Sequence, residues 1–254
     1  MIDKSVIIVG NGSILKSQKL GKRIDEFDEV VRINDWKTKG FEEIAGSKTT
    51  IWVMYNPIKN CGNFISGYKT LGLDIDSIKD IVKDLNEIWF VCWNEENLSY
   101  NWKQNGLIKE LGIYDKTKRH LSIKTSRKIS SITNPPSTGF SLIWILTHMY
   151  DKIYLTGFDF GNQIPTEGTF NHYYGSRTKE FVEKNNIHNL EFEMEYVKKL
   201  KQEGKIDFLI EDTNINKGKF IENTSKVKCR RCGKLNYLYD WEQRVCNYCE
   251  RMNI

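Results

Sequence analysis

The chain has 254 residues, of which 39% are hydrophobic and 28% charged, a composition that excludes collagen-like and wholly disordered proteins. Its net charge of +5 is a mild basic excess, which would suit an anionic ligand but not a dedicated nucleic-acid-binding protein. No apolar run approaches the ~20 residues of a membrane-spanning helix. Because the first residues also leave no room for a signal-peptide core, we expect a cytoplasmic protein without a membrane span.

Strand-like and helix-like segments alternate between residues 5 and 210. Short apolar runs, typical of strands buried on both faces, predict strands at 5–10, 29–33, 50–54, 87–93, 152–156 and 205–210. Helical patterns fall near 14–26, 95–111, 139–149 and 189–203. This alternation predicts an α/β fold with a Rossmann-like, mostly parallel sheet flanked by helices, and ligands at the carboxyl ends of its strands. No elements are predicted in 55–86, 113–136 or 160–185.

A glycine loop, Gly10-Asn11-Gly12-Ser13, follows the first predicted strand and opens the first predicted helix. Such a loop can direct backbone N–H groups at an anion. It lacks the dinucleotide-binding fingerprint, because Leu15 stands where the third glycine belongs, and it lacks the Gly-Lys-Ser/Thr ending of a P-loop. From the residues alone, an anion-binding loop and a plain tight turn both stay open.

The C-terminal end of the chain is a candidate metal-binding domain. A polar, basic linker at 213–227 separates residues 1–212 from a cysteine-rich segment at 228–254. That segment holds two CxxC pairs, formed by Cys229, Cys232, Cys246 and Cys249. Four thiolates at this spacing predict a structural zinc ribbon, since they leave no open position for catalysis. An iron site and a redox dithiol are the alternatives, and the surrounding basic residues are expected to be a solvated face.

Several motifs, in order, resemble those of one enzyme family. The large sialyl motif is matched by Val6 to Asn11, Ile24-Asp25, Asp28 to Asn34, Gly40-Phe41-Glu42 and Gly46 to Thr50. The small sialyl motif is matched by Asn134 to Phe140, His148 to Asp151 and Tyr154 to Phe158. His172-Tyr173-Tyr174 and the HxxxxE pattern from His188 to Glu193 follow. Together they resemble the animal-type sialyltransferases of glycosyltransferase family 29.

The resemblance implies a GT-A-like variant of the sheet and inverting transfer of sialic acid from a CMP-activated donor to a glycan hydroxyl. It assigns nucleotide binding to the two turns, with Asn11, Gly12, Asn34, Ser137, Thr138 and Gly139. A monophosphate leaving group can be stabilised by backbone N–H groups at two helix N-termini, so catalysis needs no metal. CMP-Kdo is an alternative donor that the sequence does not distinguish.

The attacking hydroxyl needs a base, and histidine is the natural choice. The resemblance makes His188 the general base and His172 the donor to the departing phosphate. His148 lies in an apolar helical pattern and is expected in the core. Five residues turn through ~500° on a helix, so His188 and Glu193 do not share a face. We therefore predict that His188 precedes the helix and faces the cleft, while Glu193 packs behind it.

Departures from the family leave two other functions open. We expect the membrane anchor of Golgi-type members to be absent, and Val6 and Tyr150 stand where those members carry a disulfide. Asp159 replaces an aromatic residue that some members place against the donor. Asp74 and Asp76 spell the DxD pattern of transferases that hold a sugar diphosphate through a metal. A metal-dependent transferase and a non-catalytic nucleotide-fold binding protein are the alternatives.

Overall fold

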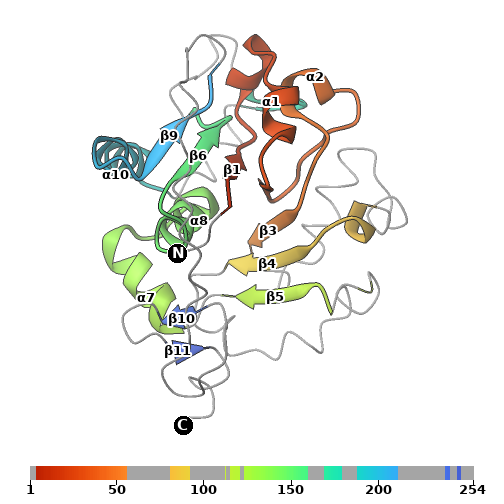
Figure 1. The fold of residues 1–254 in the computed structure, drawn as a ribbon. Helices are drawn as coiled ribbons and strands as arrows, with labels where there is room; N and C mark the ends of the chain where they lie inside the picture. The colour runs from red at the N-terminus through yellow and green to blue at the C-terminus, as the bar shows by residue number, and fades with distance from the viewer. Residues whose placement is uncertain are drawn as a thin grey trace.

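A computed structural model describes residues 4–55, 81–91, 112, 115–120, 123–159, 169–178, 188–210, 238–240 and 245–246. Its centre is a seven-stranded sheet (Figure 1) in the order β5-β4-β3-β2-β1-β6-β9. The strands are β1 (Val6–Val9), β2 (Glu29–Ile33), β3 (Ile51–Tyr55), β4 (Glu87–Val91), β5 (Thr117–His120), β6 (Ile153–Thr156) and β9 (Ile206–Phe208). Every pairing in this sheet is parallel, so the predicted α/β class is confirmed.

The strand order locates a ligand-binding edge. From β1 the chain moves outward to β5, and it then returns to place β6 on the other side of β1. The order therefore reverses at β1, and in open parallel sheets ligands bind beyond the carboxyl ends of the strands at such a reversal. The turns that follow β1 and β6 begin at Gly10 and Gly157. The strand order therefore favours these two turns as the ligand-binding region.

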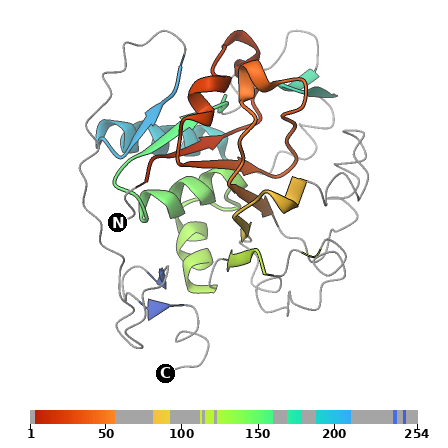
Figure 2. The ribbon, with the colours of Figure 1, turned by 45° about the vertical axis from the view of Figure 1, so that its right-hand side comes forward.

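Helices cover both faces of the sheet (Figure 2). In β1, Ile7 and Val9 belong to a core cluster with Leu15 and Ile24, while Val6 and Ile8 belong to a second cluster on the other face. The first cluster is covered by η1 (Ser13–Ser17), α1 (Gly21–Asp25) and α2 (Glu42–Ala45). The second is covered by α7 (Ile123–Ile132), α8 (Thr138–Thr147) and α10 (Leu190–Gln202). Strands buried on both faces explain why the predicted strands were continuous apolar runs.

Several elements differ from the sequence-based predictions. The helix predicted over 14–26 is η1 and α1, separated by extended backbone at Gln18. Gly21 then packs so closely on α2 that a Cβ there would lie 1.8 Å from the carbonyl oxygen of Glu42. β5, α7 and the antiparallel hairpin β7 (Thr169–His172) and β8 (Gly175–Thr178) were not predicted. The helix predicted over 95–111 lies outside the described residues.

A short antiparallel pair is what the structure describes of the cysteine-rich segment. β10 (Leu238–Asp240) pairs with β11 (Val245–Cys246), with Leu238 opposite Cys246. Cys229, Cys232 and Cys249 lie outside the described residues, as do Asp74 and Asp76. Within the described ranges no group of three or more His, Cys, Asp or Glu residues is placed to hold a metal ion. Nor is any helix there long and apolar enough to cross a bilayer.

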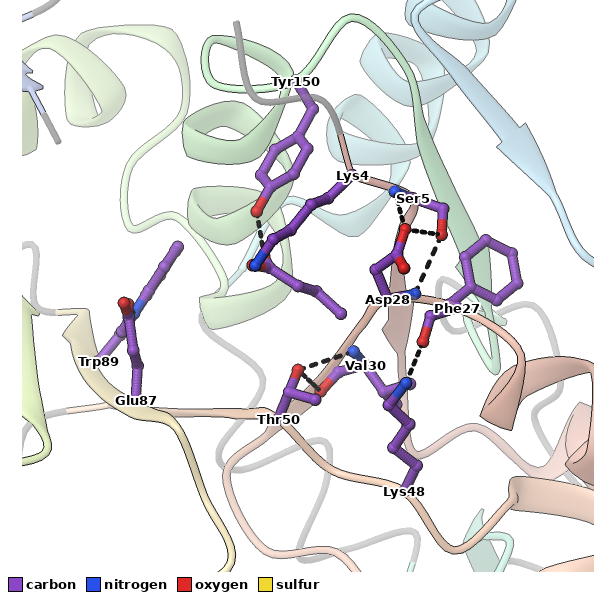
Figure 3. A network of polar contacts seen from close by, with 11 residues as sticks. Lys4, Ser5, Phe27, Asp28, Val30, Lys48, Thr50, Glu87, Trp89 and Tyr150 are labelled. Atoms are coloured by element: carbon purple, nitrogen blue, oxygen red, sulfur yellow. Dashed lines mark hydrogen bonds and ion pairs between the residues drawn. The ribbon is translucent and has the colours of Figure 1, made fainter. Parts of the chain in front are cut away.

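The amino-terminal edge of the sheet is tied by polar contacts between its first strands and the end of α8 (Figure 3). Glu29 accepts hydrogen bonds from Lys4 Nζ, at 3.1 Å, and from the hydroxyl of Tyr150. Asp28 accepts from the Ser5 amide and hydroxyl, both at 2.8 Å, and these bonds hold the pKa of Asp28 below its usual value. This edge lies at the other end of the strands from the turns after β1 and β6, so we assign these contacts to the stability of the fold.

We predict that Tyr150→Phe lowers the free energy of unfolding by about 1–3 kcal/mol, because a hydrogen bond to a charged carboxylate is lost. The Tyr150 side chain is 2% exposed, so water does not readily replace the hydroxyl. Urea denaturation followed by circular dichroism measures the change.

Tyr154→Phe is the matched control, since this buried tyrosine has no hydroxyl hydrogen bond within the described part of the chain. Equal losses in the two variants would show that the bond to Glu29 contributes nothing.

Candidate active site

The turns after β1 and β6 are joined backbone to backbone. Gly10 N–H donates to the Thr156 carbonyl, and Gly12 N–H donates to the Gly157 carbonyl, both at 2.8 Å. A Cβ on Gly10 would lie 2.4 Å from the Gly157 oxygen, and Gly157 has φ +70°, so this contact requires glycine at both positions. The bond to Gly157 uses the Gly12 N–H. This N–H is therefore already bonded within the protein, and Gly12 holds the two turns together.

Asn11, between the two glycines, is a hydrogen-bonding centre. Its side-chain Nδ2 donates to the carbonyls of Ile33, at 3.0 Å, and Asp35, at 2.8 Å, which fixes the orientation of the amide. Its backbone carbonyl accepts from the Tyr173 amide, at 3.0 Å, and from His172 Nδ1, at 3.2 Å. Oδ1 is buried and has no partner among the described residues. A buried acceptor of this kind suits a ligand hydroxyl or amino group, because a phosphate has no proton to donate.

The residues around the end of β7 attach His172 to this centre. The His172 ring stacks on Tyr174, with centroids 5.2 Å apart and planes 9° apart. The Tyr174 hydroxyl donates to the Asp35 carbonyl at 2.6 Å, and the Tyr173 hydroxyl donates to the Lys37 carbonyl at 2.7 Å. Burial raises the pKa of Tyr173. Both tyrosines were part of the sequence motif, yet only the structure shows that they hold the segment after β2.

The amino end of α8 forms the second turn. Ser137 caps the helix, with its Oγ accepting from Phe140 N–H at 3.0 Å. The Ser137 N–H and hydroxyl donate to the two carboxylate oxygens of Glu193, at 2.7 and 2.6 Å. The N–H groups of Thr138 and Gly139, at the same helix end, have no acceptor among the described residues. The nucleotide contact predicted for Ser137 is not available through its N–H, whereas Thr138 and Gly139 can each donate.

A single aromatic ring, that of Phe158, lies between the two turns. Its Cδ2 would be 3.2 Å from a Cβ on Gly10, and its Cε1 would be 3.0 Å from a Cβ on Gly139. Asp159 follows, with Oδ2 3.0 Å from the corresponding position at Gly12. The two predicted nucleotide-binding turns are therefore neighbours.

Asn34 lies at the same edge of the sheet, directly after β2. It has φ +52°, its N–H donates to the Val53 carbonyl at 2.7 Å, and its carbonyl accepts from Trp52 Nε1 at 2.7 Å. Both backbone groups of Asn34 are thus bonded to β3. A hydrogen bond that Asn34 donates to a ligand would therefore come from its side chain.

His188 lies immediately before α10, whose cap is Asn189, as the sequence predicted. Its Nδ1 is 3.0 Å from the carbonyl oxygen of Pro135, close to the start of α8. Because a carbonyl only accepts, this contact places the proton on Nδ1 and leaves Nε2 of the neutral ring as a proton acceptor. His148, by contrast, ends α8 half-buried, with Nδ1 2.6 Å from the Trp144 carbonyl.

Glu193 faces inward from the first turn of α10 and is 1% exposed. Burial raises the pKa of its carboxyl group, while the hydrogen bonds from Ser137 and the charge of His188 act to lower that pKa. A carboxylate here is stabilised by its hydrogen bonds from Ser137 and by the charge of His188. The position agrees with the prediction that Glu193 packs behind His188, and it adds a function, because Glu193 anchors the helix end that carries the free N–H groups.

We predict that Glu193→Ala lowers the free energy of unfolding by roughly 2–4 kcal/mol, because two part-buried donors of Ser137 lose their acceptor. Urea denaturation at neutral pH measures this, with exposed Glu191→Ala as the control on the same helix.

Glu193→Gln tests the charge. A raised pKa contributes stability at acidic pH that is lost as the pH rises through the folded-state value. Relative to wild type, Glu193→Gln should therefore gain stability from acidic to neutral pH. If the stability difference between Glu193→Gln and wild type did not change with pH, the raised pKa of Glu193 would be contradicted.

The chain is similar to known proteins in sequence and in fold. Residues 4–205 match the family model of glycosyltransferase family 29 (sialyltransferase). Type 2 lactosamine alpha-2,3-sialyltransferase from Rattus norvegicus is 28% identical over 209 residues, 78% of this chain and 62% of the relative. A human CMP-N-acetylneuraminate-beta-1,4-galactoside alpha-2,3-sialyltransferase is 24% identical over 216 residues, 76% of this chain and 54% of the relative. The chain thus spans less than two thirds of the length of these relatives.

The fold has solved counterparts. A mammalian sialyltransferase crystallised with Gal-beta-1-3GalNAc-ortho-nitrophenol superposes with a TM-score of 0.52 at 20% identity, covering 82% of this chain and 70% of that chain. The shared fold and the family model, which spans most of the chain, lead to one conclusion. The chain is a member of glycosyltransferase family 29, the sialyltransferases.

Proposed function

We propose that this protein transfers sialic acid from CMP-sialic acid to a hydroxyl group of a glycan, with inversion and without a catalytic metal. The observation that carries the proposal is the pair of N–H groups of Thr138 and Gly139 at the start of α8, beside the glycine turn. A helix N-terminus with two free donors is suited to one phosphate group. The human relative is named for CMP-N-acetylneuraminate and a beta-1,4-galactoside, which supports both the donor and the kind of acceptor.

The glycine turn and the start of α8 offer different hydrogen-bonding groups, and this difference orients the CMP-sugar. The α8 end offers N–H groups, so it takes the phosphate. The glycine turn offers the buried acceptor Asn11 Oδ1 and, next to Gly12, the carboxylate of Asp159. Acceptors and a negative charge repel phosphate but accept hydrogen bonds from ribose hydroxyls or a base amino group. We therefore assign the nucleoside to the glycine turn, with Asn34 at the same edge.

The reaction needs one base and stabilisation of one leaving group. Nε2 of His188 removes the proton from the acceptor hydroxyl as its oxygen bonds to the anomeric carbon of the sugar. The bond from that carbon to the phosphate oxygen breaks, and its electron pair stays on CMP. The N–H groups of Thr138 and Gly139 stabilise the charge that develops there. His172 Nδ1 is bonded to Asn11, so its Nε2 donates to the phosphate when the ring is doubly protonated.

We predict transfer when the full chain is incubated with CMP-sialic acid and type 2 lactosamine, with the product detected by mass spectrometry. His188→Ala should lower the rate by at least ~100-fold, because the base is lost. His148→Ala is the matched control, since this histidine is at the opposite end of α8.

The competing functions give different results in the same assay. Transfer from CMP-Kdo and not from CMP-sialic acid would change the sugar but keep the site. Transfer only from a sugar diphosphate with manganese would replace the proposal by the metal-dependent alternative, whose residues Asp74 and Asp76 lie outside the described residues. A His188→Ala variant as active as wild type would contradict the assigned base.

We also infer a structural zinc ion in the C-terminal segment, bound by Cys229, Cys232, Cys246 and Cys249. The antiparallel pair β10–β11, which carries Cys246, supports a small ribbon. In a reducing compartment the four cysteines form no disulfides and can bind zinc. Val6 and Tyr150, which stand at the disulfide positions of Golgi-type members, pack in the same core cluster. These features together support a cytoplasmic location.

We predict about one zinc ion per chain by atomic emission, because four thiolates complete one tetrahedral site. Cys246→Ser should lose that zinc, whereas Cys92→Ser, outside both CxxC pairs, should retain it. A wild-type chain purified with zinc present that holds none would refute the ribbon.

A further inference from the structure

We propose that the ring of Phe192, on the first turn of α10, is a stacking platform for a sugar ring of the acceptor glycan. The inference rests on the proposed function, because it takes the acceptor to be a carbohydrate positioned for His188. It adds an acceptor-binding residue to a site whose other assigned residues hold the donor or move protons.

Phe192 is exposed where a large apolar side chain is unexpected. It is 39% exposed, and of the described residues only Ile210, at 41%, is an exposed hydrophobic of comparable size. Single exposed apolar residues are common, so the exposure alone decides nothing. What distinguishes Phe192 is its position on the first turn of α10, shortly after His188.

An aromatic series leads from the core to Phe192. The rings of Phe140 and Tyr196 meet edge to face, with centroids 5.2 Å apart, and Tyr196 lies 6.5 Å from Phe192 at a tilt of 32°. Phe140 belongs to the first turn of α8, which also carries the free N–H groups of Thr138 and Gly139. The outermost ring of the series, Phe192, is therefore connected through Tyr196 to the helix turn that carries the proposed phosphate-binding groups.

The proposed base, His188, lies just before the same helix. His188 precedes Phe192 by four residues and is bonded to the Pro135 carbonyl near the start of α8. The Phe192 N–H is bonded to Asn189 Oδ1 at 3.1 Å, and Glu193 joins the turn to Ser137. These bonds fix the backbone at Phe192 relative to His188, so the ring is pre-positioned and little entropy is lost when it binds.

The chemistry of a sugar fits this surface. One face of a galactose ring presents C–H groups, which pack against the electron-rich face of an aromatic ring, while its hydroxyls remain free for polar contacts. A rigid aromatic residue beside the base would orient one hydroxyl toward His188 Nε2. The expected consequence is on acceptor binding rather than on donor binding.

The test compares variants of the full chain with type 2 lactosamine as the acceptor. Phe192→Ala should raise the KM for this acceptor about five- to tenfold, the effect of losing one aromatic stacking contact. The Kd for CMP, measured by calorimetry, should remain within about twofold of wild type. Phe192→Trp should keep a low KM, and Phe192→Leu, which is apolar but not aromatic, should raise it like alanine.

Ile210→Ala is the matched control, because it removes the other exposed apolar side chain and should leave the acceptor KM unchanged. An unchanged acceptor KM in Phe192→Ala, or a low KM in Phe192→Leu, would overturn the proposal. Failure of the proposed function is distinguished separately, since the wild-type chain would then neither bind CMP nor transfer the sugar. Circular dichroism verifies that each variant is folded.

Discussion

The backbone contact between the turns after β1 and β6 is the constraint on which the site depends. Gly10 and Gly157 approach so closely that neither position has room for a side chain. The contact sets Asn11 at the reversal of the strand order and directs Phe158 toward the start of α8. Hydrogen bonds from Asn11 then reach the segment after β2, and its carbonyl receives the His172 ring. One steric requirement thereby positions groups from four parts of the chain.

Glu193 has the corresponding function on the other side. A buried carboxylate is costly unless its oxygens accept hydrogen bonds, and Ser137 supplies two. This arrangement divides the N–H groups at the start of α8, because those of Ser137 and Phe140 are bonded within the protein, whereas those of Thr138 and Gly139 have no acceptor in the described part of the chain. The anion-binding capacity of the helix end is thus produced by a residue that does not itself contact the phosphate in our proposal. Stability and donor binding depend on the same contact.

The site is also polarised. Acceptor atoms gather at the glycine turn and donor N–H groups at α8, with one phenyl ring between them. A nucleoside monophosphate has the complementary arrangement, with hydroxyl and amino donors at one end and a charged acceptor at the other. Each histidine is bonded near one of the turns, His172 to the Asn11 carbonyl and His188 to the Pro135 carbonyl. This complementarity gives a physical reason for the order of groups that the family motifs describe.

The sequence by itself determined the α/β class, six of the strands and the family, because strands buried on both faces are written as apolar runs and the motifs are local. It also placed His188 before α10, since helix geometry separates His188 from Glu193. The structure alone decided which N–H groups of the two turns are free. Ser137 is 56 residues from Glu193, and His172 is 161 residues from Asn11. Such partners meet only when the chain has folded, so no local pattern could show that Gly12 and Ser137 are used internally. The same reason hid β5, whose sequence is polar and whose place comes from pairing with β4.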